Sequence, residues 1–579
     1  MTTLTDRVHA KAEERRWLIL GVLCFSLLVI VLDNSILNVA LPSIVRQLNA
    51  TNSQLQWMVD SYTLVFAGLL LTMGSLGDKF GRRPALQAGF VVFGAGSLLS
   101  ALSGSADQLI ASRAFMGIGG ALIMPATLSI ITNVFPAKER PKAIGFWAAT
   151  AGVGVALGPL AGGALLERFY WGSIFLVNLP IVAVGLIAGV YLIPNSKDPH
   201  APRLDLIGAV LSIASLSALL YAVIEAPTKG WTATEILVFF FGGGILLAVF
   251  FWWEQRIEHP MLDTRFWKNP RFSGASAAIA ITFFAMFGSI FLLTQYLQFV
   301  LGYSPLSTGV RLLAFAVPMM VISPISPRIV DRIGTKLTVG AGLACVAGGL
   351  LALASVNATT GFPDIAWRMA LAAAGMALTM SPATESIMGS LPLSRAGVGS
   401  AVNDTTRQVG GAVGVAVIGS VFSSIYGSKV VDALRGRPIP ASLVENAKQQ
   451  LGYALEAAGL VAHKAGIQAA RVFVTLAKTS FIDGFHAGLY VGAASAAIGF
   501  ILVLIYLPSR PRPEDVERQT NEFDGNRRDR VAAAADAAAA DTAAADAEAP
   551  VGTRVVDADG SGDGSGDGHR PAPARAPSR

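Results

Sequence analysis

Long apolar runs at regular intervals constrain the fold of this chain more than any other feature of its sequence. Each run has about the 20 residues that a helix needs to cross the hydrocarbon core of a bilayer. Of the 579 residues, 53% are hydrophobic and only 14% are charged, a composition too apolar for an ordinary soluble protein. The sequence therefore predicts an all-α polytopic membrane protein. The fourteen predicted spans are 17–41, 55–76, 84–103, 109–132, 143–166, 171–193, 204–224, 233–253, 272–299, 307–330, 337–356, 366–390, 397–425 and 484–507.

The order of these spans predicts two six-helix bundles with two helices inserted between them. The bundles are expected at 17–193 and 272–507, and the inserted pair at 204–253. An internal repeat supports this division, because the segment DRIGTK at 331–336 repeats the pattern DKFGRR at 78–83. Two homologous halves are therefore implied.

Three segments fall outside the predicted bundles or interrupt them. Residues 1–16 form a polar, basic N-terminal segment. Residues 427–480 contain a capping-box pattern, Ser442-Leu-Val-Glu445, and predict a helical hairpin on the outer surface. Residues 510–579 pass into Ala-Asp and Gly-Ser-Asp repeats that cannot bury a core, so we expect a disordered tail.

The distribution of Lys and Arg predicts the orientation. With the N-terminus inside, the short inner segments collect 22 of these residues and the short outer loops four. The positive-inside rule then places both termini in the cytoplasm. Because the cations sit in separate loops and form no stripe with interleaved aromatics, we expect no nucleic-acid binding.

A charged turn joins the second and third predicted spans. Its glycines permit a tight reversal, its cations favour the cytoplasmic face, and its aspartate gives them a partner. The pattern GxLGDxxGRRxxL resembles the loop between helices 2 and 3 of the major facilitator superfamily. The resemblance implies a gating role for Gly74, Gly77, Asp78, Gly81, Arg82 and Arg83.

One carboxylate, Asp33, lies well inside the first span, where an ionised side chain costs about 2.5–3.5 kcal/mol. Arg113 lies at a similar depth in the fourth span and is the expected partner. Both stretches resemble motifs of the fourteen-helix drug:proton antiporters of the EmrB-QacA type, and that resemblance implies proton coupling. A structural pair that only fixes helix packing is the alternative.

The fifth span carries glycines four residues apart. Gly154, Gly158 and Gly162 form one stripe without side chains, and Pro159 removes a backbone donor beside it. A neighbouring helix can approach closely along such a stripe. The stretch resembles the antiporter motif GxxxGPxxGG, which is associated with exporters.

Three further charged residues lie in apolar surroundings toward the inner half: Glu385, Asp404 and Arg407. They are candidates for a proton relay or for binding a cationic substrate. Asp404 and Arg407, one helical turn apart, are equally interpretable as a self-neutralised structural pair.

The sequence contains no metal-ligand spacing, catalytic triad or phosphate loop, so we expect no enzyme, metal or cofactor. The resemblance implies a proton-coupled exporter of hydrophobic or cationic amphipathic small molecules in the bacterial inner membrane. Export of an endogenous lipid, siderophore or metabolite remains an alternative, as does a non-transporting membrane scaffold or sensor. The sequence leaves the oligomeric state open.

Overall fold

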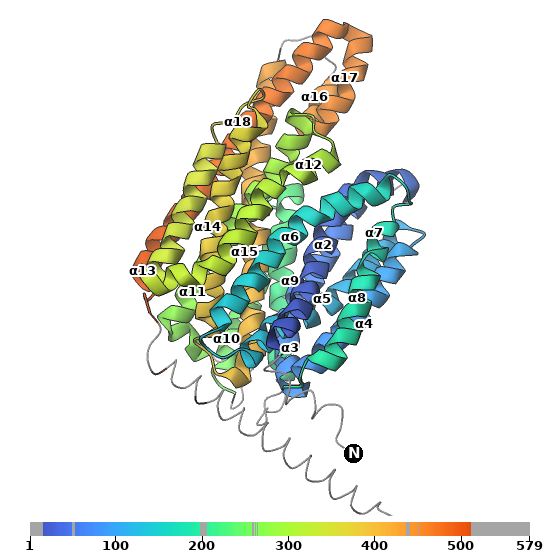
Figure 1. The fold of residues 1–579 in the computed structure, drawn as a ribbon. Helices are drawn as coiled ribbons and strands as arrows, with labels where there is room; N and C mark the ends of the chain where they lie inside the picture. Colours follow the sequence, from blue (N-terminus) through green and yellow to red (C-terminus); the bar gives the residue numbers. More distant parts are fainter. Residues whose placement is uncertain are drawn as a thin grey trace, which may run out of the picture.

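The structure is a computed structural model. It describes residues 15–48, 52–196, 205–257, 260, 262, 264–435, 441–449 and 451–510, together with positions 514 and 521. Regular structure in these residues is entirely helical (Figure 1). The predicted all-α membrane fold is therefore confirmed.

The first half of the chain forms a bundle in which consecutive and distant helices pack together. α3 and α4 both pack against α5, while α2 packs against α6. The predicted sixth span is divided into a four-residue helix and a longer one. The helices are α2 (Arg16–Leu48), α3 (Asn52–Phe80), α4 (Arg82–Ala101), α5 (Ala106–Val134), α6 (Arg140–Leu166), α7 (Ser173–Leu176) and α8 (Asn178–Leu192).

Two helices, α9 (Leu206–Lys229) and α10 (Thr234–Glu254), follow the first half. α10 packs on α9, and α9 contacts α3 of the first half and α15 of the second. The loop between them is attached to the second half as well, because the indole N–H of Trp231 donates to the hydroxyl of Ser420 at 2.9 Å. The inserted pair therefore bridges the two halves.

The second half repeats the helical bundle and extends it at one end (Figure 1). α13 packs against α14 and α18, and α11 packs against α15. Its elements are η1 (Thr264–Lys268), α11 (Pro270–Gln295), the π-helix η2 (Tyr296–Val300), α12 (Pro305–Arg311), α13 (Leu313–Leu353), α14 (Phe362–Met388), η3 (Leu393–Arg395), α15 (Ala396–Leu434), α16 (Ala441–Gln449), α17 (Leu451–Ala465) and α18 (Ile467–Tyr506).

Several helices run further than their predicted spans. α15 continues to Leu434 and α18 begins at Ile467, so the flanks of the segment 427–480 are extensions of two long helices. α16 and α17 fill the space between these extensions, at the end of the molecule opposite the α3–α4 turn (Figure 1). The predicted terminal segments 1–16 and 510–579 lie almost wholly outside the described residues.

Eleven segments of the described chain are long and apolar enough to cross a membrane. One of them, Leu306–Leu353, covers the predicted span 307–330 and most of the span 337–356, and α13 within it breaks at Gly334. α6 and α14, each predicted as a span, do not belong to the eleven. The exact number of fourteen spans stays a prediction.

Each half contains the same hydrogen bond, next to a glycine at an equivalent position. Gly81 has φ 114°, and the N–H of the next residue donates to the carbonyl of Ser196 at 2.9 Å, just after α8. Gly334 has φ 83°, and the N–H of the next residue donates to the carbonyl of Ser509 at 2.9 Å, just after α18. Such positive φ values favour glycine. The internal repeat of the sequence thus corresponds to a repeat in three dimensions.

Candidate functional site

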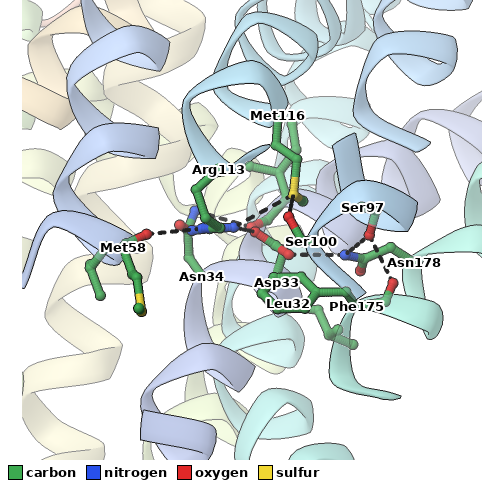
Figure 2. A network of polar contacts seen from close by, with 12 residues as sticks. Leu32, Asp33, Asn34, Met58, Ser97, Ser100, Arg113, Met116, Phe175 and Asn178 are labelled. Carbon is green, nitrogen blue, oxygen red and sulfur yellow. Dashed lines mark hydrogen bonds and ion pairs between the residues drawn. The ribbon is translucent and has the colours of Figure 1, made fainter. Parts of the chain in front are cut away.

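A buried ion pair between α2 and α5 lies inside the first half (Figure 2). Nη1 of Arg113 contacts Oδ2 of Asp33, and both side chains are 0% exposed. Arg113 also donates from Nε to the carbonyl of Met58 on α3 at 3.1 Å. Its guanidinium lies 4.5 Å from the centre of the Tyr62 ring, also on α3, so the charge has partners on α3 as well as on α2.

The second oxygen of Asp33 is held by Asn178, a residue that was not among the predicted site residues. Nδ2 of Asn178, at the start of α8, donates to Oδ1 of Asp33 at 2.9 Å and contacts the hydroxyl of Ser97 at 3.0 Å (Figure 2). Both oxygens of the carboxylate are therefore hydrogen-bonded, as a buried charge requires. An asparagine inside an apolar run was the available signal, because such a residue is buried only with partners.

The glycine stripe of α6 faces α2 next to this ion pair. A methyl group placed on Gly154 would lie 2.7 Å from Cγ1 of Val31, and one placed on Gly158 would lie 2.9 Å from the backbone nitrogen of Ile36. The hydroxyl of Ser35 donates to the carbonyl of Gly154 at 3.0 Å. The two helices are therefore in backbone contact.

The remaining members of the stripe are less informative. Gly162 is buried in α6. Pro159 lies within the same helix, and its side chain is outside the described side chains.

The α3–α4 turn connects the two halves. Asp78 accepts hydrogen bonds from the backbone N–H groups of Gly397, at 2.9 Å, and Val398, at 3.1 Å, in the first turn of α15. Arg82 donates to Asp78 at 2.7 Å and 2.9 Å, and also to the carbonyl of Leu393 at 2.8 Å. A carboxylate at a helix N-terminus is favoured by the unpaired N–H groups and by the helix dipole. We call this set of contacts the Asp78 latch.

The other residues predicted for this turn divide between two tasks. Gly74 permits close packing of the halves, because a methyl group there would lie 2.6 Å from the carbonyl oxygen of Gly397. Gly81 and Arg83 act within the first half, the latter through a 3.5 Å contact with the carbonyl of Ile193. Gly77 has ordinary space around it.

Asp404 and Arg407 form a separate cluster in the second half. Nη1 of Arg407 lies 3.7 Å from Oδ1 of Asp404. Nη2 of Arg407 donates to the hydroxyl of Thr384 on α14 at 3.0 Å. Glu385, the next residue on α14, interacts electrostatically with Arg140 and Arg271 instead. The structure thus brings together Asp404 and Arg407 and keeps Glu385 apart from them.

No group of three metal-ligating side chains occurs among the residues that the structure describes. The charged groups of the site are paired with one another, with backbone groups and with aromatic rings.

Two helical bundles related by an internal repeat, with buried charges in their interior, define the class of secondary membrane transporters. The sequence profile of the Major Facilitator Superfamily matches residues 23–415, and the chain belongs to this family. The resemblance that the motifs indicated is confirmed.

Two mycobacterial relatives match most of the chain. The Multidrug efflux pump LfrA of Mycolicibacterium smegmatis is 35% identical over 85% of this chain and 95% of its own length. The Multidrug resistance protein Stp of Mycobacterium tuberculosis is 34% identical over 82% of this chain and 89% of its own. Among solved structures, the proton:xylose symporter XylE covers 89% of this chain and 99% of its own, with a TM-score of 0.55 and 15% identity, which shows a shared fold.

Proposed function

We propose that the protein is a proton-coupled efflux transporter that exports hydrophobic or cationic amphipathic compounds by drug:proton antiport. The buried pair of Asp33 and Arg113 carries the proposal, because both side chains are 0% exposed. An ionised carboxylate at this depth is costly. The names of the two mycobacterial relatives, multidrug efflux and multidrug resistance, support the choice of substrate class.

Asp33 is the proposed proton carrier. Protonation would remove the negative charge and leave Arg113 with the Met58 carbonyl and the Tyr62 ring. These contacts lower the cost of a buried cation that has lost its carboxylate. The hydrogen bond from Asn178 to Asp33 keeps the carboxyl group oriented in either protonation state. The pair can therefore open and close without a large rearrangement.

The glycine contact between α2 and α6 supports a link between this pair and the bundle. Ser35, two residues after Asp33, contacts the Gly154 carbonyl, so a shift of α2 reaches α6 directly. α6 in turn packs against α13 of the second half. We propose that proton exchange at Asp33 alters the packing between the halves, which rock about a central site.

The proton gradient is a sufficient driving force for export. One charge moving across 100 mV supplies about 2.3 kcal/mol, and one unit of pH difference adds about 1.4 kcal/mol. At about 1.4 kcal/mol per tenfold, one proton sustains a substrate gradient of roughly a hundredfold or more. No ATPase and no other enzymatic activity is part of the proposal.

The proposed location is the bacterial inner membrane, with both termini in the cytoplasm and the Asp78 latch on the cytoplasmic side. The excess of Lys and Arg in the predicted inner segments supports this orientation. The proposed partners are the small-molecule substrate, protons and the lipid bilayer.

Transport by everted membrane vesicles tests the proposal. Vesicles with an acidic interior should accumulate ethidium, because protons leave as the substrate enters. Collapse of the proton gradient with an uncoupler should abolish the accumulation. Accumulation that persists without the gradient would refute antiport.

A further inference from the structure

Arg407 is enclosed by aromatic rings from both halves. Its guanidinium carbon lies 4.7 Å from the centre of the Trp147 ring on α6 and 5.5 Å from that of Phe283 on α11. The indole N–H of Trp147 donates to the hydroxyl of Thr127 at 3.2 Å, which fixes the ring. A cation over desolvated aromatic faces is strongly attracted.

The carboxylate beside these rings is only partly satisfied by Arg407. The 3.7 Å separation from Asp404 exceeds the 2.7–2.9 Å of a good charge-assisted hydrogen bond. Oδ1 of Asp404 accepts from Asn403 at 3.1 Å. Within the described part of the chain, Oδ2 of Asp404 and Nε of Arg407 make no hydrogen bond. The hydroxyl of Ser400 is close to the carboxylate. Both residues are buried.

This arrangement contrasts with the ion pair in the first half. There both carboxylate oxygens of Asp33 are hydrogen-bonded. The carboxylate of Asp404 instead keeps one oxygen without a hydrogen bond. It therefore retains the capacity to bind a second cation.

The cluster lies at the depth expected of a transport site. Arg407 follows the latch residue Gly397 by ten positions on the same helix, a rise of about 15 Å. That is about half the hydrocarbon thickness. Substrate sites of secondary transporters lie near the midplane, between the two halves. Trp147 and Arg407 face each other across this interface.

We propose that Trp147, Phe283 and Asp404 form a binding site for an organic cation, and that Arg407 occupies this site while the halves are in contact at the Asp78 latch. Separation of the halves at that end draws Arg407 away from the Trp147 face. The ring and the carboxylate then accept a substrate with delocalised or shielded positive charge. The inference rests on the proposed function, for which it names the site and the substrate class.

Binding to the purified full-length protein tests the inference without requiring transport. The probes are tetraphenylphosphonium and its neutral analogue triphenylphosphine oxide, with Kd measured by equilibrium dialysis. Trp147→Leu and Asp404→Asn should each weaken tetraphenylphosphonium binding about tenfold or more, equivalent to about 1.4 kcal/mol. Trp147→Phe should weaken it less, because an aromatic face remains. Binding of the neutral analogue should change less than twofold.

Two further variants separate a binding role from a structural one. Arg407→Gln should tighten tetraphenylphosphonium binding about tenfold, because the internal competitor is removed, whereas a merely structural arginine would not produce this gain. Trp252→Leu is the matched control: Arg256 lies 4.5 Å from the centre of the Trp252 ring, and Trp252 is 52% exposed. This control should leave both affinities unchanged.

An unchanged Kd for tetraphenylphosphonium in Trp147→Phe, Trp147→Leu and Asp404→Asn would overturn the inference. Weaker or unchanged binding in Arg407→Gln would also overturn it. If the wild-type protein drives proton-dependent ethidium accumulation in vesicles while these affinities do not change, the site is wrong and the proposed function stands. If the wild-type protein accumulates no substrate, the proposed function fails.

Discussion

Neutralising Asp78 should open the end of the molecule that the latch holds closed. Asp78→Asn keeps the size of the side chain but removes the negative charge at the N-terminus of α15. The carboxylate accepts from Gly397 at 2.9 Å and from Val398 at 3.1 Å. The side-chain oxygen of an asparagine can accept one of these hydrogen bonds. Its NH₂ group would face the other backbone N–H, and two donors form no hydrogen bond. Arg82 keeps its contact with the Leu393 carbonyl at 2.8 Å.

The expected effect follows from these bonds. Hydrogen bonds to charged groups contribute about 1.5–3 kcal/mol each, and the substitution removes one and weakens the other. The closed state should lose about 3 kcal/mol relative to the open one, which is roughly a hundredfold in the equilibrium. An open state populated at about 1% in the wild type would then become about as abundant as the closed state.

Spin labels on either side of the latch measure this shift. Phe80 and Ile333, 60% and 45% exposed, are suitable positions for labelled cysteines after Cys24 and Cys345 are replaced by serine. Distance distributions from double electron–electron resonance should gain a longer component in Asp78→Asn. Asp331→Asn is the matched control, because Asp331 occupies the repeated position and is exposed. Identical distributions in wild type and Asp78→Asn would refute the latch.

Three further predictions concern the glycine contact, the proton carrier and the tail. Gly158→Leu should insert into the membrane but abolish transport, because Gly158 has no room for a side chain beside α2. Gly163→Ala is the control and should transport normally, because its methyl group would lie 3.4 Å from its nearest neighbour. Vesicle transport assays check both variants. Asp33→Asn should release fewer protons than wild type when tetraphenylphosphonium is added to purified protein. Equal proton release at equal substrate occupancy would assign the coupling role to another residue. Because Asp33→Asn also leaves Arg113 without its carboxylate, the double variant with Arg113→Ala is the control. Deletion of residues 515–579 should leave transport and thermal stability nearly unchanged, and a deletion protein that inserts but cannot transport would contradict this.

The contact between Asp33 and Arg113 could be predicted because each is a lone charge in an apolar span at similar depth. The position of Glu385 could not be predicted in the same way. Successive residues on a helix point about 100° apart, so Thr384 meets Arg407 while Glu385 is directed toward Arg140 and Arg271. Charge patterns do not reveal this rotation.

The partners of Asp78 could not all be predicted from the sequence, for a different reason. The sequence suggested the cations of its own turn, and Arg82 is indeed one partner. The others are backbone N–H groups of Gly397 and Val398, and every residue except proline carries such a group. Hydrogen bonds to backbone groups therefore cannot be recognised from the composition of the sequence or from the spacing of its residues. The division of α13 at Gly334, by contrast, agrees with the two separate spans predicted at 307–330 and 337–356.

The hydrogen bond after α18 sets a limit on how far the chain can be shortened. The carbonyl of Ser509 accepts the N–H that follows Gly334 at 2.9 Å, and its backbone oxygen lies 2.8 Å from where a side chain on that glycine would begin. A truncation after residue 514 keeps this bond. A truncation that ends at Leu507 removes this hydrogen bond and the packing of Ser509 against Gly334, although only a few more residues are lost. A nested series of C-terminal deletions should therefore show a sharp threshold in thermal stability between these two end points.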